Sequence, residues 1–248
     1  EASLEFLEQT AIATVGDVMD LTEENRILVK EGLKKLNHTT NPGLHALIQA
    51  NGLEQAQLNA YHIGFVLGPC INASGRLDTA KRALSLLLEE NAEKAAALAQ
   101  ELKELNDERK DMTAKGVEQA VELIENGPLK EDKVLVVYLP GCHESLAGII
   151  AGRLRERYYR PTIVITDSAE GIKGSGRSIE TYNMFEELMK CKELFTKFGG
   201  HPMAAGLSME KGMAEVLRKR LNEQTTLTSE DLTEKVVIDV PMPIDYIT

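Results

Sequence analysis

The chain has 248 residues, 43% of them hydrophobic, and its 28 basic and 39 acidic residues give a net charge of −11. This length allows two domains with real hydrophobic cores, and the acidic balance argues against a generally basic nucleic-acid binder without excluding a local basic cleft. Aromatic residues make up only 4% and Trp is absent, so base stacking on aromatic side chains is not expected to be the main binding device.

The first 80 residues are predicted to form short helices. Residues 23–36 form one clear helix, with Thr22 as a candidate N-cap and acidic residues in the first turn. Asn41-Pro-Gly marks a break, and the helical pattern resumes over 53–67.

A long amphipathic pattern follows. From Thr79 to about Ile124, apolar residues recur at alternating spacings of three and four, while the other positions are mostly charged. We expect a long connecting helix, or a helix pair, over 81–127, which acts as a spacer between two domains and which Asn126-Gly-Pro ends. Its acidic side chains are most simply a solvated face.

After Lys133 the pattern changes to strands. Apolar runs at 134–139 and 162–166 flank a helix at 145–158, which predicts a β-α-β unit with parallel strands. A strand at 171–178, a helix at 183–190, a strand at 201–208 and a helix at 209–224 complete an α/β domain. A last strand at 235–240 is assigned to a following domain.

The three cysteines, Cys70, Cys142 and Cys191, are widely spaced and odd in number. They predict neither a disulfide framework nor a zinc site, and a reducing cytoplasm fits them. The sequence shows no signal peptide and no apolar run near 18 residues, so we expect no membrane association.

Two glycine-rich polar stretches carry the chemistry. Residues 198–206 read Phe-Gly-Gly-His-Pro-Met-Ala-Ala-Gly, and residues 174–178 read Gly-Ser-Gly-Arg-Ser. Glycines let backbone N–H groups approach a ligand, and an arginine can bind two phosphate oxygens at once. The stretches predict a phosphate site formed by Ser175, Gly176, Arg177, Gly199, Gly200 and His201. The alternatives are a tight turn beside a buried histidine and a surface arginine at a strand end.

Four segments carry a resemblance to a known family. Residues 199–206 resemble the Gly-Gly-His-x-x-Ala-Ala-Gly motif of the DHH-associated domain, and residues 143–154, followed by Tyr-Arg-Pro, are similar to the first helix of that domain. Gly-Pro-Cys-Ile-Asn-Ala-Ser-Gly-Arg-Leu at 68–77 resembles a segment of the RecJ branch, and Thr-Val-Gly-Asp-Val at 14–18 resembles the last metal-ligand motif of DHH catalytic domains. Their order and spacing identify the chain as a member of the RecJ-type exonucleases of the DHH phosphoesterase superfamily.

The resemblance implies an α/β fold class and a division of the chain. A mostly helical rear part of a DHH catalytic domain occupies 1–80, the long connecting helix 81–127, an α/β DHH-associated domain with a mixed sheet 128–226, and the start of an OB-type domain 227–248. It also implies a metal-dependent enzyme that degrades single-stranded DNA from the 5′ end in repair and recombination. The Asp-His-His motif of the family precedes these segments and does not occur in this sequence. We therefore expect a fragment that is inactive alone.

The resemblance assigns roles to residues of the first half. Asp17 is expected to bind Mn²⁺ or Mg²⁺, although a helix-capping aspartate is the structural alternative. Asn72 and Arg76, expected on a loop before the long helix, contact the strand's backbone or cap that helix. Cys70 stands where an arginine is common, so one cation near the nucleic acid is missing.

In the second half, Arg177 and Ser175 are expected to receive the 5′-terminal phosphate. His201, the one candidate catalytic residue there, contacts the scissile phosphate or a neighbouring one, or it fixes the turn. His143 begins a helix and is either a substrate contact or a cap.

Two other functions are compatible with the sequence. One is a DHH-type phosphodiesterase for nanoRNA or dinucleotides. The 71–78 segment and the long amphipathic pattern from Thr79 to about Ile124 argue against it. The other is a non-catalytic nucleic-acid or partner-binding module, whose long helix docks a helicase or a single-strand-binding protein.

Overall fold

The structure, a computed structural model, describes residues 5–246. The chain divides into two compact units, Glu1–Met112 and Thr113–Thr248. Within the described range, no helix is both long and apolar enough to cross a membrane.

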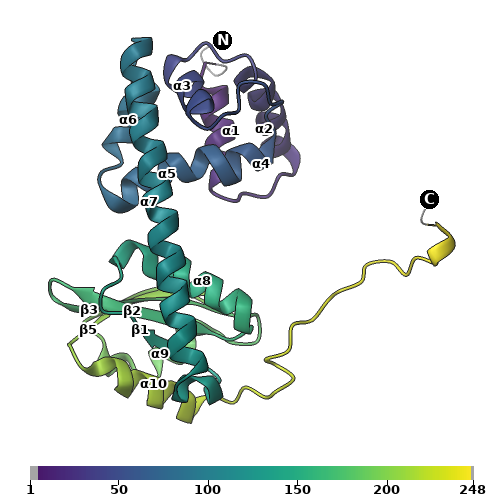
Figure 1. The fold of residues 1–248 in the computed structure, drawn as a ribbon. Coiled ribbons are helices and arrows are strands. Elements are labelled where there is room, and N and C mark those ends of the chain that lie inside the picture. The colour runs from purple at the N-terminus through teal and green to yellow at the C-terminus, as the bar shows by residue number, and fades with distance from the viewer. Residues whose placement is uncertain (1–4, 247–248) are drawn as a thin grey trace. The chain divides into compact units, whose positions relative to one another are not determined.

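In the described part of the first unit, all regular secondary structure is helical (Figure 1). Its elements are α1 (Leu7–Gly16), α2 (Glu23–Leu36), α3 (Pro42–Ala50), α4 (Ala60–His62), the π-helical turn η2 (Ile63–Leu67), α5 (Gly68–Leu77), α6 (Lys81–Leu88) and the first part of α7 (Ala92–Glu125). The predicted helix 23–36 is confirmed in its bounds. Thr22 occupies the N-cap position, but its side chain makes no capping hydrogen bond.

The helix predicted at 53–67 begins later and ends later than expected. Residues 53–59 are not helical because a tertiary contact holds them: the Asn37 side chain donates to the Leu58 carbonyl at 3.0 Å and accepts from its N–H at 2.7 Å. The helix starts after Asn59, which forms a capping box with His62. It then continues through η2 and α5 to Leu77.

Of the helix or helix pair expected over 81–127, the structure has the pair, α6 and α7. The backbone is extended at Glu89, with ψ 127°, and the Asn91 side chain accepts a hydrogen bond from the N–H of Lys94 at 3.0 Å, so a new helix starts there. Ala95 and Leu102 of α7 are buried in the core of the first unit. The first part of α7 is therefore a core helix and does not act only as a spacer.

The second unit contains a five-stranded mixed sheet in the order β1-β2-β3-β5-β4. The strands are β1 (Leu135–Tyr138), β2 (Thr162–Ser168), β3 (Gly171–Arg177), β4 (Lys197–His201) and β5 (Ala204–Met209). The other elements are η3 (Pro128–Glu131), η4 (Glu144–Leu146), α8 (Ala147–Tyr158), α9 (Met184–Met189), η5 (Lys192–Leu194), α10 (Met213–Gln224) and η6 (Ile244–Tyr246). β1 and β2 are parallel, as the β-α-β pattern predicts, and the other pairs are antiparallel.

The two faces of the sheet differ in their cover. One face carries Val136, Ile163, Ile172 and Leu207, which pack in a core with residues of α9 and α10. The other face packs against α8. Ile150 of α8 in turn contacts α7 at Gly116, where an added Cβ would lie 2.5 Å from Ile150 Cδ1.

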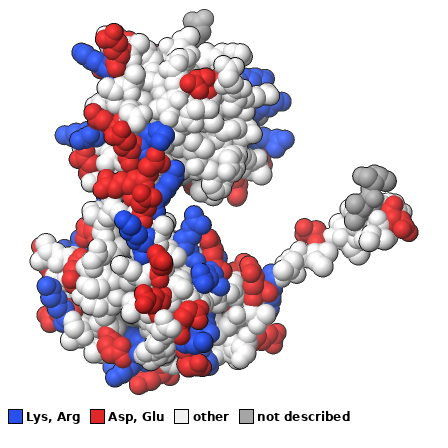
Figure 2. Space-filling model, in the orientation of Figure 1, with Lys and Arg blue, Asp and Glu red and all other residues white. Residues whose placement is uncertain are grey.

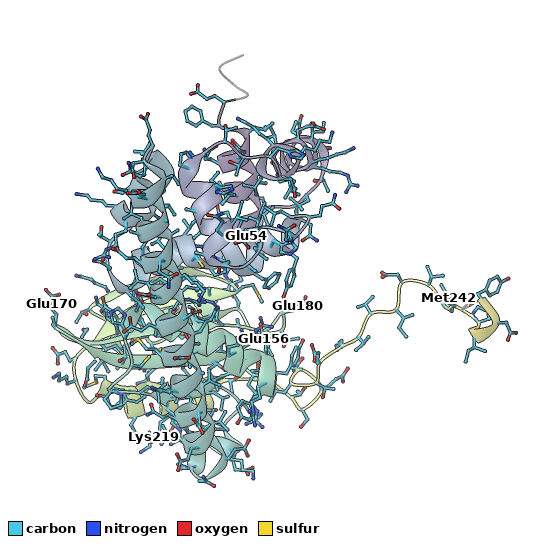
Figure 3. The ribbon with its side chains drawn as sticks, turned by 45° about the horizontal axis from the view of Figure 1, so that its top comes forward. Glu54, Glu156, Glu170, Glu180, Lys219 and Met242 are labelled. Carbon is cyan, nitrogen blue, oxygen red and sulfur yellow. The ribbon has the colours of Figure 1, made fainter. Side chains whose placement is uncertain are left out.

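Two strand predictions need correction. The strand expected at 201–208 is confirmed from Ala204 onward as β5, but its first residue, His201, ends the preceding strand β4, and a turn separates the two strands. The strand expected at 235–240 is absent: Val236 and Val237 are more than 80% exposed, and no strand is assigned after β5 in the described residues. Figure 3 shows Met242 on the extended segment that follows α10. An apolar β-branched run does not form a strand without an edge to pair with.

Candidate functional site

The register of the sheet collects the predicted polar residues on one face. Residues paired across neighbouring strands point to the same side of a sheet. Arg177 pairs with Ala204, which pairs with His201; Ser175 pairs with Gly206, which pairs with Gly199. We call this surface of β3, β5 and β4, on the same side as α8, the open face.

Arg177 lies on the open face at the end of β3, against α8. Its guanidinium donates from Nη1 to the Gly176 carbonyl at 2.8 Å and to Ser175 Oγ at 3.2 Å. A Cβ on Gly148 of α8 would lie 2.8 Å from Ser175 Oγ and 2.9 Å from Arg177 Nη2. The missing side chain of Gly148 therefore makes the room that the guanidinium occupies.

The glycines of the two predicted stretches divide by face. Gly199 and its partner Gly206 have nothing within 4 Å of an added Cβ, so their exposed surface is open. Gly176 and Gly200 point to the other side: a Cβ on Gly176 would lie 3.2 Å from Met184 Sδ, and one on Gly200 would lie 2.7 Å from Ala205 Cα. Alternation along a strand turns the side-chain positions of Gly176 and Gly200 toward the protein, whereas the prediction for these two residues concerns their backbone N–H groups and stays a prediction.

Two hollows that share Lys173 and Ser208 extend over the open face. One, of about 370 Å³, is lined by Glu144, Ser145, Ala147, Lys173, Gly174, Ser175, Gly206, Leu207 and Ser208. The other, of about 250 Å³, is lined by Ser168, Ala169, Glu170, Lys173, Thr196, Lys197 and Ser208. Together they form a groove lined by hydroxyl groups, lysines and backbone.

The charges of this groove are mixed. Lys173 pairs with Glu144 at 2.7 Å, and Lys197 lies 3.8 Å from Glu170, which Figure 3 shows at the turn between β2 and β3. Acidic and basic side chains are also interspersed over the face of the molecule drawn in Figure 2. Binding of a polyanion here depends on local donors, since the chain is acidic as a whole.

The two histidines differ in position. His201 is exposed at the end of β4 on the open face, and its Nδ1 accepts a hydrogen bond from the N–H of Met203 at 3.3 Å. His143 caps η4: its Nδ1 lies 2.8 Å from Ser145 Oγ and accepts from the Ser145 N–H at 3.3 Å. The capping alternative thus describes the observed contacts of His143, whose ring is exposed at the start of α8.

In the first unit, Asp17 and Asn72 line one pocket. Its volume is about 440 Å³, and Gln9, Ile12, Ala13, Gly16, Asp17, Gly68, Ile71, Asn72 and Leu87 line it. Asp17 follows the last turn of α1 and is exposed. Asn72 and Arg76 lie one helical turn apart on α5 and not on a loop as predicted, because the helix that starts at Ala60 continues through them.

The residues described do not form a metal centre by themselves. No group of three or more His, Cys, Asp or Glu that could hold a metal ion occurs among residues 5–246. Asp17 offers one carboxylate in a pocket whose other polar side chains are amides. Mg²⁺ and Mn²⁺ sites need more oxygen ligands, so a metal pair does not fit this set.

Cys70 is a buried thiol and not a ligand-facing group. Its Sγ lies 3.6 Å from Asn51 Oδ1 and accepts from Asn106 Nδ2 at 3.4 Å. Burial raises the pKa of this thiol, so it stays protonated at neutral pH. The side chain fills core space where the resembling family commonly carries a cation.

Several residues of the open face were missed by sequence reasoning. Lys173 precedes Ser175 and Arg177 at spacings of two, a period that indicates a shared strand face. Ser208 joins them only through the pairing of β5 with β3, which no local pattern reveals. Lys197 and Gly206 were not missed, since they lie next to or within the 198–206 stretch that the sequence singles out. Gly148 lies within the 143–154 segment, but its closeness to Arg177 is a tertiary contact that the sequence does not reveal.

Comparison with protein families matches residues 131–226 to the DHHA1 domain. Among curated proteins, the chain is similar to the single-stranded-DNA-specific exonuclease RecJ of Bacillus subtilis, with 39% identity over 98% of this chain and 31% of the relative. The RecJ of Escherichia coli is 37% identical over 96% of this chain and 43% of the relative. The chain thus spans less than half the length of these relatives.

Solved structures agree with the sequence matches. RecJ of Thermus thermophilus in complex with Mg²⁺ superposes with a TM-score of 0.80 at 33% identity, covering 89% of this chain and 34% of that one. A structure of exonuclease RecJ bound to manganese gives a TM-score of 0.75 at 32% identity, with 88% and 54% covered.

Proposed function

Because residues 131–226 form a DHHA1 domain and the chain is RecJ-like over nearly its whole length, we propose that it is part of a metal-dependent 5′→3′ exonuclease acting on single-stranded DNA in repair and recombination. In this proposal the DHHA1 domain binds the 5′-terminal phosphate of the strand. The exonuclease activity in the relatives' names belongs to proteins of which this chain covers less than half.

The observation that carries the proposal is the convergence on the open face. Arg177 supplies a fork of N–H donors, Ser175 a hydroxyl, and His201 an imidazole, all on the same side of neighbouring strands. Between them Gly199 and Gly206 present bare backbone with open space above it. Such a surface accepts phosphate oxygens and reads no base, as expected of a nuclease without sequence specificity.

The metal-dependent chemistry belongs to the whole enzyme in this proposal. Mg²⁺ or Mn²⁺ would activate water for attack on the phosphodiester, and Asp17 would supply one of several oxygen ligands. Since residues 5–246 hold no metal-binding group of three or more His, Cys, Asp or Glu, we expect this polypeptide alone to release no nucleotides. Nucleotide release that requires Mn²⁺ and scales with the amount of polypeptide would contradict this assignment of the metal site.

We place the function in the cytoplasm. All three cysteines are free thiols, which suits a reducing compartment. A duplex must be opened before one strand can lie on the open face, so a helicase or a single-strand-binding protein is the partner we propose.

The test is a titration of this polypeptide with a short single strand at low salt. Strands with a 5′-phosphate and with a 5′-hydroxyl are compared on wild type, Arg177→Ala and Arg220→Ala, the last an exposed arginine on α10 paired with Glu193. A charge-assisted bidentate contact contributes about 1.5–3 kcal/mol, so Arg177→Ala should weaken binding of the phosphorylated strand about 10- to 100-fold. Arg220→Ala should bind like wild type. Equal binding in all combinations would remove the phosphate site from the open face.

A further inference from the structure

Two aromatic rings of the first unit are stacked on each other in solvent. The centroids of Tyr61 and Phe65 are 4.9 Å apart with an angle of 27° between the ring planes. The two residues are 63% and 69% exposed. The other stacked rings are Phe185 and Phe195 against Phe198; Phe195 and Phe198 pack against the core of the second unit, and Phe185 is half-buried. Because large rings in this chain are otherwise mostly covered and only 4% of its residues are aromatic, an exposed stacked pair requires an explanation.

The pair is held by a rigid, irregular piece of helix. Tyr61 lies in α4, which the Asn59 capping box fixes, and Phe65 lies in the π-helical turn η2. On the opposite side of the same turns, Ile63 and Leu67 are fully buried in the core of the first unit. The rings thus project from an anchored element, and π-helical turns within α-helices occur frequently at functional sites.

Polar groups follow the rings along the same helix. Tyr61, Phe65, Asn72 and Arg76 are all exposed, and their spacings of four, seven and four residues place them on one side of the α4–η2–α5 helix. Asn72 also lines the pocket that contains Asp17. The order along this side is two rings, an amide and a guanidinium.

We propose that Tyr61 and Phe65 form a base-stacking platform for single-stranded nucleic acid. The outer face of the ring pair takes a nucleobase, and the adjoining phosphates run toward Asn72 and Arg76. Alternation of aromatic rings with cations is the chemistry by which single strands are bound without sequence preference. The inference rests on the proposed function and adds a base contact in the first unit to the phosphate contacts of the second.

Two features favour a nucleobase over a protein as the occupant. The rings are already parallel, so a base extends an existing stack without rearrangement. The same side of the helix carries Arg76. Its guanidinium complements a phosphate group but would not pack favourably against the apolar face of a partner helix. Docking of a protein partner on the rings is the alternative outcome of the test.

The absence of Trp from the chain provides a selective reporter. Phe65→Trp places a single indole in the stack, and a 5′-phosphorylated thymidine oligomer should quench its fluorescence. An abasic strand of the same length, which has phosphates but no bases, should bind more weakly and leave the emission nearly unchanged. Quenching that is equal with both strands, or absent while the oligomer binds, would overturn the platform.

Alanine variants test the contribution of the rings. Tyr61→Ala and Phe65→Ala should each weaken binding of the oligomer about 5- to 150-fold, since stacking on one ring contributes in that range. Leu88→Ala, which removes a side chain 70% exposed on α6, is the matched control and should bind like wild type. Unchanged binding in both ring variants would overturn the platform and favour a protein partner for the rings. A wild-type chain that binds neither strand would refute the proposed function itself.

Discussion

Gly148→Ala should weaken binding of a 5′-phosphate although residue 148 offers no group to the ligand. The added Cβ would lie 2.8 Å from Ser175 Oγ and 2.9 Å from Arg177 Nη2, about half an ångström closer than an ordinary contact allows. Since α8 packs on β2 and β3 along its length, the two polar side chains are the groups that can move. The hydroxyl and the guanidinium therefore shift from their positions on the open face.

The size of the effect follows from the contact that is disturbed. A charge-assisted hydrogen bond contributes about 1.5–3 kcal/mol, and losing the alignment of one of two such bonds should weaken binding about 5- to 10-fold. The fold should tolerate the change, because alanine is favoured over glycine in a helix by about 1 kcal/mol, which offsets part of the crowding. Binding of the 5′-phosphorylated strand and thermal unfolding are measured on the same preparations.

Gly152→Ala is the matched control on the same helix. Its Cβ would meet only Arg177 Cγ, at 4.0 Å, which is an ordinary contact, so binding should stay at the wild-type level. In a double-mutant cycle, Gly148→Ala should have little further effect once Arg177 is alanine, because it acts through that side chain. An undiminished affinity in a folded Gly148→Ala variant, or an equal loss in the Arg177→Ala background, would refute the reasoning.

Three further predictions concern binding and stability. Gly206→Ala should raise the free energy of unfolding by about 0.5–1 kcal/mol and weaken binding of single-stranded DNA, because its Cβ enters open space on the open face. Urea unfolding measures the first effect and titration the second, and a loss of stability would contradict the open geometry. Asp132→Ala should cost about 2–3 kcal/mol in urea unfolding, because Asp132 holds the largely buried Arg218 guanidinium through two hydrogen bonds, whereas the exposed Asp107→Ala should cost under about 1 kcal/mol. Burial, reinforced by Glu193, raises the pKa of the Cys191 thiol from 9.0 to about 11. The contribution of this thiol to the free energy of unfolding is complete below pH 9 and falls between pH 9 and 11, by about 1.4 kcal/mol per pH unit. A Cys191→Ser variant that loses stability equally over this range would show the assignment to be wrong.

The sequence alone predicted the elements whose signals are local. The acidic first turn and apolar period of 23–36 define α2 to the residue, and the two apolar runs around 145–158 define the parallel β1–α8–β2 unit. The four motifs at 14–18, 68–77, 143–154 and 199–206 together indicated the family through their order and spacing, since residue identities at fixed spacings do not depend on how the chain folds. Stretches with a strong period or a specific motif can be assigned without tertiary information.

Tertiary contacts decided the rest, and they corrected several local predictions. Asn37 holds Leu58 in a non-helical segment, and the continuous helix that follows carries Asn72 and Arg76, which the sequence placed on a loop. The tight turn that was the alternative interpretation of Gly199–His201 is an edge strand, because β5 is available to pair with it. The apolar run at 235–240 forms no strand because nothing in the described residues pairs with it.

The candidate site shows the same division. The residue types Ser, Arg, Gly and His were named from the sequence, because their chemistry suits a phosphate in any fold. Which of them share a face was decided by the strand register, which brings Ser175, Arg177, Gly199 and His201 together and turns Gly176 and Gly200 away. The room for the Arg177 guanidinium comes from Gly148, a residue 29 positions earlier on a different element. The alternation of side chains across a strand is fixed by covalent geometry, but the pairing of strands depends on contacts between residues far apart in the chain, and so only the folded structure determines it.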